Sequence, residues 1–324
     1  MLATFKVGRL VLLLSLALTT SSCVRGGFYG TPNSDSTPAF DNSIEGDSST
    51  QSCQNWGPFS APTLLSAVNS QDDDWGPSLG SNSAVLMFAS YRLGGPGGGD
   101  IWQALRQDPH TSFSTPTLVS NINSASYEAS PVLSVDGLTL LFGSARSGSS
   151  TEIWITTRTS VTDNFSPPSA LSTVNAPGMS LPQHLSPDSH TLWLTSDKEA
   201  TLDIYLATRP DGESPFSGAT PVASLNSPDA EHSFTLSSDG LEAIFSSDRP
   251  GGAGLLDLWL ARRPEPTHEF EPPQNLSMLN TSNDDTFARL SPDGRTLYFN
   301  RDSLVAGGRS ADIWLSHRSC DDKE

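Results

Sequence analysis

The sequence is poor in basic residues and in helix-forming patterns. Lys and Arg together number 18 against 36 Asp and Glu in a chain of 324 residues, so the formal net charge is −18. A domain this acidic repels nucleic acid and anionic lipid surfaces, so we expect no nucleic-acid partner. After residue 23 no amphipathic helical pattern with capping residues occurs, which leaves short strands as the regular structure to expect.

Long apolar runs are also scarce. The apolar stretch Leu10–Leu18 follows two basic residues and is too short to span a bilayer as a helix. We therefore interpret residues 1–22 as a signal peptide for export. The segment TTSSC (19–23) resembles the end of a bacterial lipoprotein signal, which implies lipidation of Cys23. Thr20 occupies a position where that pattern prefers Leu, so ordinary signal cleavage is the alternative.

Cysteine is rare, with three in the chain. An odd number in an exported protein needs an explanation, and lipidation of Cys23 leaves one pair, Cys53 and Cys320. Residues 23–55 are rich in Ser, Thr, Asp, Asn and Gly, so they are predicted to be a flexible tether. These features predict a cell-envelope protein, periplasmic or associated with the outer membrane, whose only membrane attachment is an N-terminal lipid anchor.

What the sequence does contain is one unit repeated five times. In each unit an acidic residue is followed two residues later by Trp or Tyr and six residues later by Arg. A segment that begins with Phe recurs at intervals of 54, 52, 51 and 54 residues. A fixed period of about 50 residues is typical of a repeat architecture. The first set comprises DIWQALR (100–106), EIWITTR (152–158), DIYLATR (203–209), DLWLARR (257–263) and DIWLSHR (312–318).

Each unit is expected to consist of four strands, which we name a to d. Strand a is of the PVLS (131–134) type, b of the LTLLF (138–142) type, c contains the DIW motif, and d begins with Phe. Asp-Gly turn residues precede several of the b strands. Four-stranded units around an axis form a β-propeller. We predict an all-β fold, a five-bladed β-propeller of four-stranded antiparallel blades over residues 56–320, followed by a tail (321–324).

The order of the strands predicts how the ring closes. The first unit begins with strand d and the last ends with strand c, so residues 59–66 are expected to pair with residues 312–318. Pairing of the N-terminal strand with the C-terminal strands removes two open sheet edges. The chain link from c to d is missing at this point, and a Cys53–Cys320 disulfide would replace it. Two free thiols are the alternative.

The unit L-S-x-D-G-x-x-L-x-F-x-S-x-R followed by D-I-W-x-x-x-R resembles the WD40-like β-propeller repeat of the TolB type. The resemblance is clearest in LSVDGLTLLFGSAR (133–146) and LSSDGLEAIFSSDR (236–249), and it covers residues 59–318. Members of the TolB type have six blades and take part in envelope assemblies as protein-binding components. The resemblance therefore implies an envelope propeller that binds a partner.

Residues that recur in every unit are expected to hold the blades, and a ligand site is expected where the symmetry breaks. An acid opens strand a in four units and a basic residue ends strand b in four. The third unit has Ser180 for the acid, and the fifth has Ser303 for the base with Arg301 displaced by two. These residues form either a circle of ion pairs that ties adjacent blades or a polar funnel that binds a ligand. The ligand-binding candidates in this set are Asp74, Glu128, Glu231, Asp285, Arg92, Arg146, Lys198 and Arg249.

Three further ligand-binding candidates break the repeat on or next to strand a. They are His184, His232 and Arg289, which lie in different units and are the best candidates for an asymmetric site. The acidic runs QDDD (71–74) and SNDD (282–285) offer oxygen atoms that suit Ca²⁺ but lack a fixed loop signature. We therefore predict no metal site and no cofactor.

The Gly-rich segments are not phosphate loops. LGGPGGG (93–99) and PGGAG (250–254) are followed by neither Lys-Ser/Thr nor a helix. We interpret them as wide loops between strands b and c.

Two functions compete. The first is a non-catalytic binding or scaffold module for an envelope protein or a glycan, acting as a monomeric propeller, because the repeat carries no catalytic motif. The alternative is a carbohydrate-active enzyme of the glycoside hydrolase type, which needs two carboxylates roughly 5–10 Å apart. The four acids of strand a would supply them near the axis, although catalytic acids normally differ in environment. A serine peptidase is favoured less than either, because the sequence shows no α/β pattern for the catalytic domain that accompanies such propellers.

Overall fold

A computed structural model describes residues 53, 55–80, 83–148, 150–305 and 308–321. The predicted signal peptide, Cys23 and most of the predicted tether lie outside these residues. The chain divides into two units, Met1–Thr50 and Gln51–Glu324, and the second holds all the described structure. Within the described ranges, no helix has the length and apolar character needed to cross a membrane.

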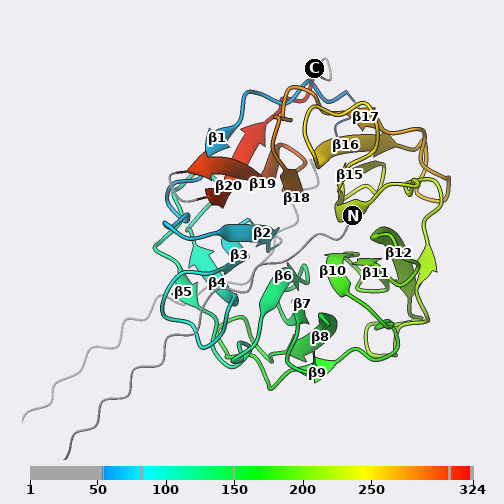
Figure 1. The fold of residues 1–324 in the computed structure, drawn as a ribbon. Coiled ribbons are helices and arrows are strands. Elements are labelled where there is room, and N and C mark those ends of the chain that lie inside the picture. The colour runs from blue at the N-terminus through cyan, green and yellow to red at the C-terminus, as the bar shows by residue number, and fades with distance from the viewer. Residues whose placement is uncertain (1–52, 54, 81–82, 149, 306–307, 322–324) are drawn as a thin grey trace, which may run out of the picture. The chain divides into compact units, whose positions relative to one another are not determined.

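The described part of the second unit forms five four-stranded antiparallel sheets around an axis (Figure 1), which confirms the predicted fold class. Figure 1 shows β2, β6, β10 and β18, all of them a strands, closest to the axis.

Blade 1 contains β2 (Asp74–Leu79), β3 (Val85–Ser90), β4 (Asp100–Leu105) and β5 (Thr117–Leu118), and blade 2 contains β6 (Glu128–Leu133), β7 (Thr139–Ser144), β8 (Glu152–Thr157) and β9 (Ser169–Ala170). Blade 3 contains β10 (Ser180–Leu185), β11 (Thr191–Ser196), β12 (Asp203–Thr208) and β13 (Thr220–Pro221). Blade 4 contains β14 (Glu231–Leu236), β15 (Glu242–Ser247), β16 (Asp257–Arg262) and β17 (Gln274–Asn275), and blade 5 contains β18 (Asp285–Leu290), β19 (Thr296–Val305), β20 (Gly308–His317) and β1 (Thr63–Leu64).

The hydrophobic cores lie between neighbouring blades. Strands such as β3 (VLMFAS) and β7 (TLLFGS) are apolar along most of their length because both of their faces are covered. Met87 of β3 and Phe142 of β7, both fully buried, belong to one cluster that joins blades 1 and 2. Burial of such side chains is the main force that holds adjacent blades together.

Ser-x-Asp-Gly forms the turn from strand a to strand b, as predicted. In blade 2 the Ser134 hydroxyl donates to Asp136 Oδ1 at 2.5 Å and accepts from the N–H of Thr139 at 2.8 Å. Gly137 has a φ of +71°, the left-handed region that glycine enters without a steric penalty. The turn is therefore held by its own side chains and needs no contact from outside the blade.

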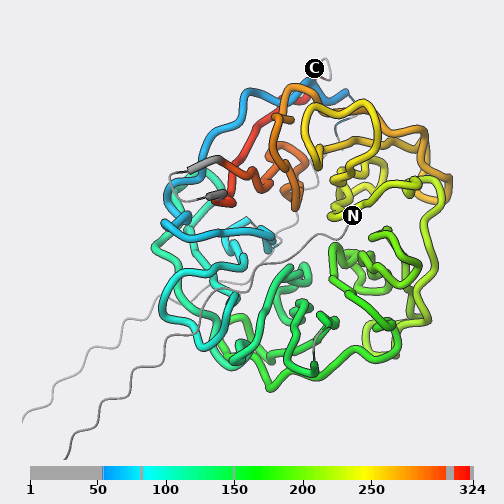
Figure 2. The backbone as a smooth tube through the Cα atoms, viewed as in Figure 1, coloured from blue at the N-terminus to red at the C-terminus, as the bar shows by residue number. Residues whose placement is uncertain are grey.

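The ring closes through the two ends of the chain, as Figure 2 shows where the blue and red segments meet. In β1, Thr63 pairs with Leu315 and Leu64 with Trp314 of β20. The Ser60 N–H also donates to the His317 carbonyl at 2.7 Å. The predicted pairing of residues 59–66 with residues 312–318 is thus confirmed, although the regular strand is only two residues long.

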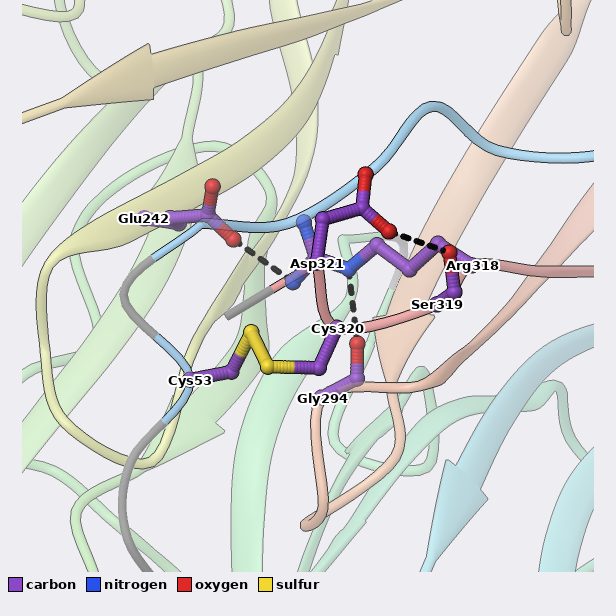
Figure 3. Close-up of a disulfide and its surroundings, with 7 residues drawn as sticks. All are labelled: Cys53, Glu242, Gly294, Arg318, Ser319, Cys320 and Asp321. Carbon is purple, nitrogen blue, oxygen red and sulfur yellow. Dashed lines mark hydrogen bonds and ion pairs between the residues drawn. A yellow bond between two sulfur atoms is a disulfide. The ribbon is translucent and has the colours of Figure 1, made fainter. Parts of the chain in front are cut away.

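A Cys53–Cys320 disulfide, with its Cα atoms 5.8 Å apart, lies beside this closure (Figure 3) and confirms the predicted pair. Next to it, the buried Arg318 donates its Nε–H to the Gly294 carbonyl at 2.7 Å and its Nη2–H to Glu242 Oε2 at 2.6 Å. Glu242 belongs to β15, so this ion pair joins blade 5 to blade 4. The closure therefore combines a covalent bond, a short strand and a buried ion pair.

The structure explains why Arg and Phe recur together in every unit. The Arg after strand c stacks on the Phe of the d segment in the same blade, with the guanidinium carbon 4.3–4.9 Å from the ring centre. Its Nε–H donates to a carbonyl of the a–b turn at 2.7–2.8 Å. The five stacked pairs are Arg106–Phe113, Arg158–Phe165, Arg209–Phe216, Arg263–Phe270 and Arg318–Phe59.

An Asn in each loop from d to a fastens that loop to the blade it leaves. Asn226 accepts from the Ile204 N–H at 2.9 Å and donates to the Ile204 carbonyl at 3.0 Å. The same two bonds recur in all five blades. The pairs are Asn69–Ile313, Asn123–Ile101, Asn175–Ile153, Asn226–Ile204 and Asn280–Leu258.

The Gly-rich segments form the loops between strands b and c in blades 1 and 4, as interpreted from the sequence. A Cβ atom on Gly97 would lie 2.1 Å from the Ser126 carbonyl oxygen, whereas a Cβ on Gly98 would meet no atom within 4 Å. We expect Gly97→Ala to lower the free energy of unfolding by about 1–3 kcal/mol, because the backbone of the crossover loop must move. Gly98→Ala is the matched control and should change it by less than about 0.5 kcal/mol. Equal effects of the two variants in urea unfolding would contradict this packing.

Candidate functional site

The acids that open strand a are fully buried and paired with arginine in four blades. Their side chains have 0% exposure, and the nitrogen–oxygen distances of the ion pairs are 2.5, 3.1, 2.8 and 2.7 Å. Buried carboxylates require such partners, since an unpaired charge away from water is costly. The pairs are Asp74–Arg92, Glu128–Arg146, Glu231–Arg249 and Asp285–Arg301.

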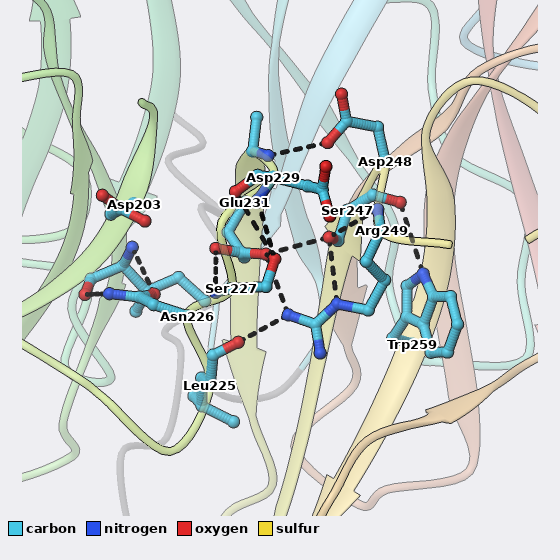
Figure 4. A network of polar contacts seen from close by, with 12 residues as sticks. Asp203, Leu225, Asn226, Ser227, Asp229, Glu231, Ser247, Asp248, Arg249 and Trp259 are labelled. Atoms are coloured by element: carbon cyan, nitrogen blue, oxygen red, sulfur yellow. Dashed lines mark hydrogen bonds and ion pairs between the residues drawn. The ribbon is translucent and has the colours of Figure 1, made fainter. Parts of the chain in front are cut away.

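Glu231 illustrates the network in detail (Figure 4). Its Oε1 accepts from the hydroxyls of Ser227 at 2.7 Å and Ser247 at 2.9 Å, and from Arg249 Nη2 at 2.8 Å. Burial raises the pKa of Glu231 above its ordinary value, while the bonds from Ser227, Arg249 and Ser247 act in the opposite direction. Arg249 also donates to the Leu225 carbonyl at 2.6 Å. The Glu231 side chain is fully buried, and both of its carboxylate oxygens accept bonds from within the protein.

Two details of the predicted circle of ion pairs are wrong. Each ion pair lies within one blade. Adjacent blades are tied instead by a bond from the same arginine to a backbone carbonyl in the loop that arrives from the preceding blade, as Arg92 donates to Val68 and Arg249 to Leu225. The fifth blade does have its pair, because Arg301 itself faces Asp285 in the strand register and donates its Nε–H at 2.7 Å. Spacing along the sequence concealed this, since the other blades have Ser at the position of Arg301.

Blade 3 alone lacks the acid, as its sequence indicates. The Ser180 hydroxyl donates to Ser196 Oγ at 3.2 Å where the other blades have ion pairs. Lys198 donates to the Ala219 carbonyl at 2.9 Å, and its Nζ lies 4.0 Å from the centre of the Tyr205 ring. Lys198 is therefore held by a carbonyl bond and a cation–π contact, and it has no carboxylate partner among the described residues.

Arg289 and His184 do come together, at the axis. They lie on β18 of blade 5 and β10 of blade 3, with Arg289 Nη1 3.5 Å from His184 Nδ1. Both line a space of about 90 Å³ to which all five blades contribute, which we call the axial cavity. Its lining consists of Leu79, Val132, Leu133, Val135, His184, Leu185, Pro187, Leu236, Ser238, Arg289, Leu290, Ser291 and Pro292.

A narrow space of about 10 Å³ continues the axis beyond Arg289. Gly76, Ser130 and Phe287 line it and have φ values of +65°, +48° and +50°. The left-handed region is unfavourable for Ser and still more so for Phe, and such strain concentrates at functional sites. These residues sit at the register shifts of β2, β6 and β18.

Arg289 has no carboxylate partner among the described residues. Its Nη2–H donates to the Gln183 carbonyl at 2.6 Å, and its buried Nε–H has no acceptor. Burial lowers the pKa of Arg289 to about 10, so the guanidinium is charged at neutral pH. Burial, together with the charge of Arg289, lowers the pKa of His184 to about 3, so this ring is neutral. Sequence reasoning found both residues but missed the Gln183 carbonyl and the apolar walls, which only the register of the inner strands brings to the axis.

The third symmetry-breaking residue, His232, does not belong to the axial cavity. It lies on β14 next to Glu231. Burial lowers the pKa of His232, and the carboxylates of Asp248 and Asp284 oppose that shift. The described residues hold no group of three or more His, Cys, Asp or Glu side chains arranged to bind a metal ion.

The stability of the protein should depend on pH through His184. A folded-state pKa of about 3 against an ordinary value of 6.5 means that stability is full above pH 6.5 and is lost as the pH falls toward 3. The loss should approach about 1.4 kcal/mol per pH unit. His184→Gln should remove this part of the slope in denaturant unfolding between pH 7 and 4. His190→Gln, at a histidine whose side chain is 43% exposed, is the control, and an unchanged slope in both variants would contradict this prediction.

No protein-family model and no curated protein matches this chain. Among solved structures it is similar to a family 117 glycoside hydrolase from Zobellia galactanivorans, with 11% identity over 82% of this chain and 92% of the other, at a TM-score of 0.56. It is also similar to a putative TolB from Agrobacterium tumefaciens, with 15% identity over 80% and 85%, at a TM-score of 0.51. TolB from Acinetobacter baumannii is 19% identical over 78% of this chain and 55% of that protein, at a TM-score of 0.48. This chain therefore spans about half of that protein's length. Identities this low show the propeller fold alone.

Proposed function

We propose that this protein is an exported, lipid-anchored β-propeller of the bacterial cell envelope that binds a partner without catalysing a reaction. The export signal and Cys23 in the sequence support the location. The partner is an envelope protein or a glycan, and it presents an acidic group to the axial cavity. The propeller acts as a monomer, with the lipid as its only membrane attachment.

One observation carries this proposal: Arg289 is a partly buried cation beside a cavity, and it has no carboxylate counter-ion among the described residues. In four blades an arginine of strand b, or of the loop directly after it, has a buried carboxylate from the same blade, as Arg92 has Asp74. An uncompensated charge lowers stability, so its presence at the axis is best explained by a ligand that completes the site. The ligand would supply the missing negative charge.

The glycoside hydrolase alternative has weaker support. The likeness to a family 117 enzyme concerns the fold, and the four strand-a acids are buried and paired. Among the described residues that line the axial cavity and its continuation there is no Asp or Glu. A pair of carboxylates across a sugar ring therefore has no counterpart at the axis.

A crosslinking pull-down from intact envelopes tests the proposal. Wild-type protein and Arg289→Met serve as baits, with mass spectrometry as the readout, and a saccharide array scored for binding and cleavage runs in parallel. We expect a protein or an acidic glycan that the wild type retains and Arg289→Met loses. Equal recovery by both baits would contradict the role of the axial cavity, and cleavage of an array sugar would support the enzyme instead.

A further inference from the structure

The ligand class of the axial cavity follows from three properties of its lining: charge, polarity and size. Arg289 is the single charged residue among the described lining residues, because His184 is neutral at physiological pH. Its guanidinium makes one short bond, to the Gln183 carbonyl, and a long contact of 3.5 Å to His184. Several N–H donors of a planar fork are thus left for an acceptor.

Aliphatic side chains form a large part of the cavity wall, beside the polar groups of His184, Ser238, Arg289 and Ser291. Leu133, Leu185, Leu236 and Leu290 come from four different blades and occupy the same position at the end of strand a. Repetition of Leu at this position surrounds the axis with apolar surface. A ligand must therefore carry an apolar part next to its charged group, since a fully polar molecule would lose its hydration without compensation.

A single positive charge in apolar walls selects a single negative charge. A phosphate or sulfate dianion would bury a second charge without a partner, which costs several kcal/mol. A carboxylate has one charge, and its two oxygens match the guanidinium fork. We assign the proton of the neutral His184 ring to Nε2, because Nδ1 faces the Arg289 donor.

Size limits the apolar part. A cavity of about 150 Å³ accommodates benzene. The axial cavity, at about 90 Å³, is smaller and suits a carboxylate on a stem of a few carbons. A pyranose ring is at least as large as benzene, so the volume of the axial cavity is too small to enclose one.

We propose that the axial cavity binds a monocarboxylate on a short branched apolar stem, an inference that rests on the proposed function and deepens it. Two sources share this chemistry: a free short-chain carboxylate, and the C-terminus of a partner chain that ends in an aliphatic residue. In either case the carboxylate meets Arg289, and the stem lies against the leucines of the inner strands.

Calorimetric titration of the mature chain tests this with isobutyrate, its neutral counterpart isobutyramide, and inorganic phosphate. We expect one isobutyrate site, with affinity at least tenfold higher than for isobutyramide or phosphate. Arg289→Met should lose the binding at least tenfold, and Arg289→Lys should lose much of it because Lys lacks the planar fork. Arg295→Met removes the same charge from an exposed position on an a–b turn and should stay within twofold of the wild type.

A short peptide that ends in Leu, as free acid and as amide, separates the two sources. Tighter binding of the free acid than of isobutyrate supports a chain terminus, and binding of isobutyrate alone supports a small metabolite. Binding of phosphate as tightly as isobutyrate, or unchanged binding by Arg289→Met, would overturn the inference. Arg289→Met should fold at least as stably as the wild type, because the substitution removes an uncompensated charge. A large loss of stability would mean that Arg289 stabilises the fold and does not serve to bind a ligand.

The two proposals fail in different ways. If the pull-down recovers a partner that depends on Arg289 but no carboxylate binds, the proposed function stands and the ligand class is wrong. If isobutyrate binds and the envelope yields no partner, the site is real and the protein acts on a small molecule.

Discussion

Reduction of the Cys53–Cys320 disulfide is expected to lower the free energy of unfolding by about 2–5 kcal/mol. The bond joins residues 267 positions apart, so it restricts almost the whole unfolded propeller. Without it, noncovalent contacts hold the outer strand of blade 5, among them the two residue pairs of β1, the Ser60–His317 bond and the contacts of Arg318. The melting temperature should fall by roughly 5–15 °C for a domain of this size.

Chemical denaturation with and without reductant measures this effect. The double variant Cys53→Ser/Cys320→Ser should show the reduced stability in both conditions and no response to reductant. Fraying should begin at β1, so amide exchange in residues 59–66 should increase before that of blades 1 to 3. A change in stability below about 0.5 kcal/mol would mean that noncovalent contacts close the ring by themselves.

Arg249→Met is expected to lower the free energy of unfolding by about 3–5 kcal/mol, because it leaves Glu231 buried without its counter-ion. Lys198→Met in blade 3 is the matched control. It removes a cation from the end of the equivalent strand, but that cation has no carboxylate partner in the described structure, so its loss should cost less than about 1 kcal/mol. Equal losses would show that the cation–π contact, and not the ion pair, provides the stability.

The pH dependence of Arg249→Met adds a second readout. Burial already raises the pKa of Glu231, and removal of the arginine should raise that pKa further. A carboxyl with a raised folded-state pKa favours folding below its unfolded pKa and loses that contribution as the pH rises. The deficit of Arg249→Met against the wild type should therefore shrink as the pH falls toward 4, and Arg249→Met/Glu231→Gln should be more stable at neutral pH than Arg249→Met.

Features that recur in every blade were predictable from the sequence, because each of the five units folds into the same four strands and needs the same residues to do so. The DIW motif and the Asp-Gly turn map to the expected strand and turn, whereas each regular d strand begins four residues after its Phe and is two residues long. The closure and the disulfide followed from the order of the strands. The repeat could not show which partner each residue takes, and the Asn clamps on strand c and the stacking of Arg on Phe emerged only from the structure.

The axial site was only partly predictable. Arg289 and His184 were identifiable because they break the repeat, whereas their contact depends on bulges that shift the inner strands of blades 3 and 5. Arg301 shows the opposite error, since it looked displaced in the sequence and is paired in the fold. Register within a strand moves a side chain from one face to the other, and spacing alone does not report a bulge.

The account depends on Arg289 binding the carboxylate of a ligand. The ¹H–¹⁵N spectrum of the arginine side chains tests this binding most directly. The Nε–H signal of Arg289 is identified by its loss in Arg289→Met and followed during titration with isobutyrate. We predict that this signal moves downfield and saturates with the calorimetric binding curve, while the Nε–H signal of Arg249, which donates to Ser247 at 3.1 Å, stays in place. An Arg289 signal that does not move at saturating isobutyrate would contradict the account.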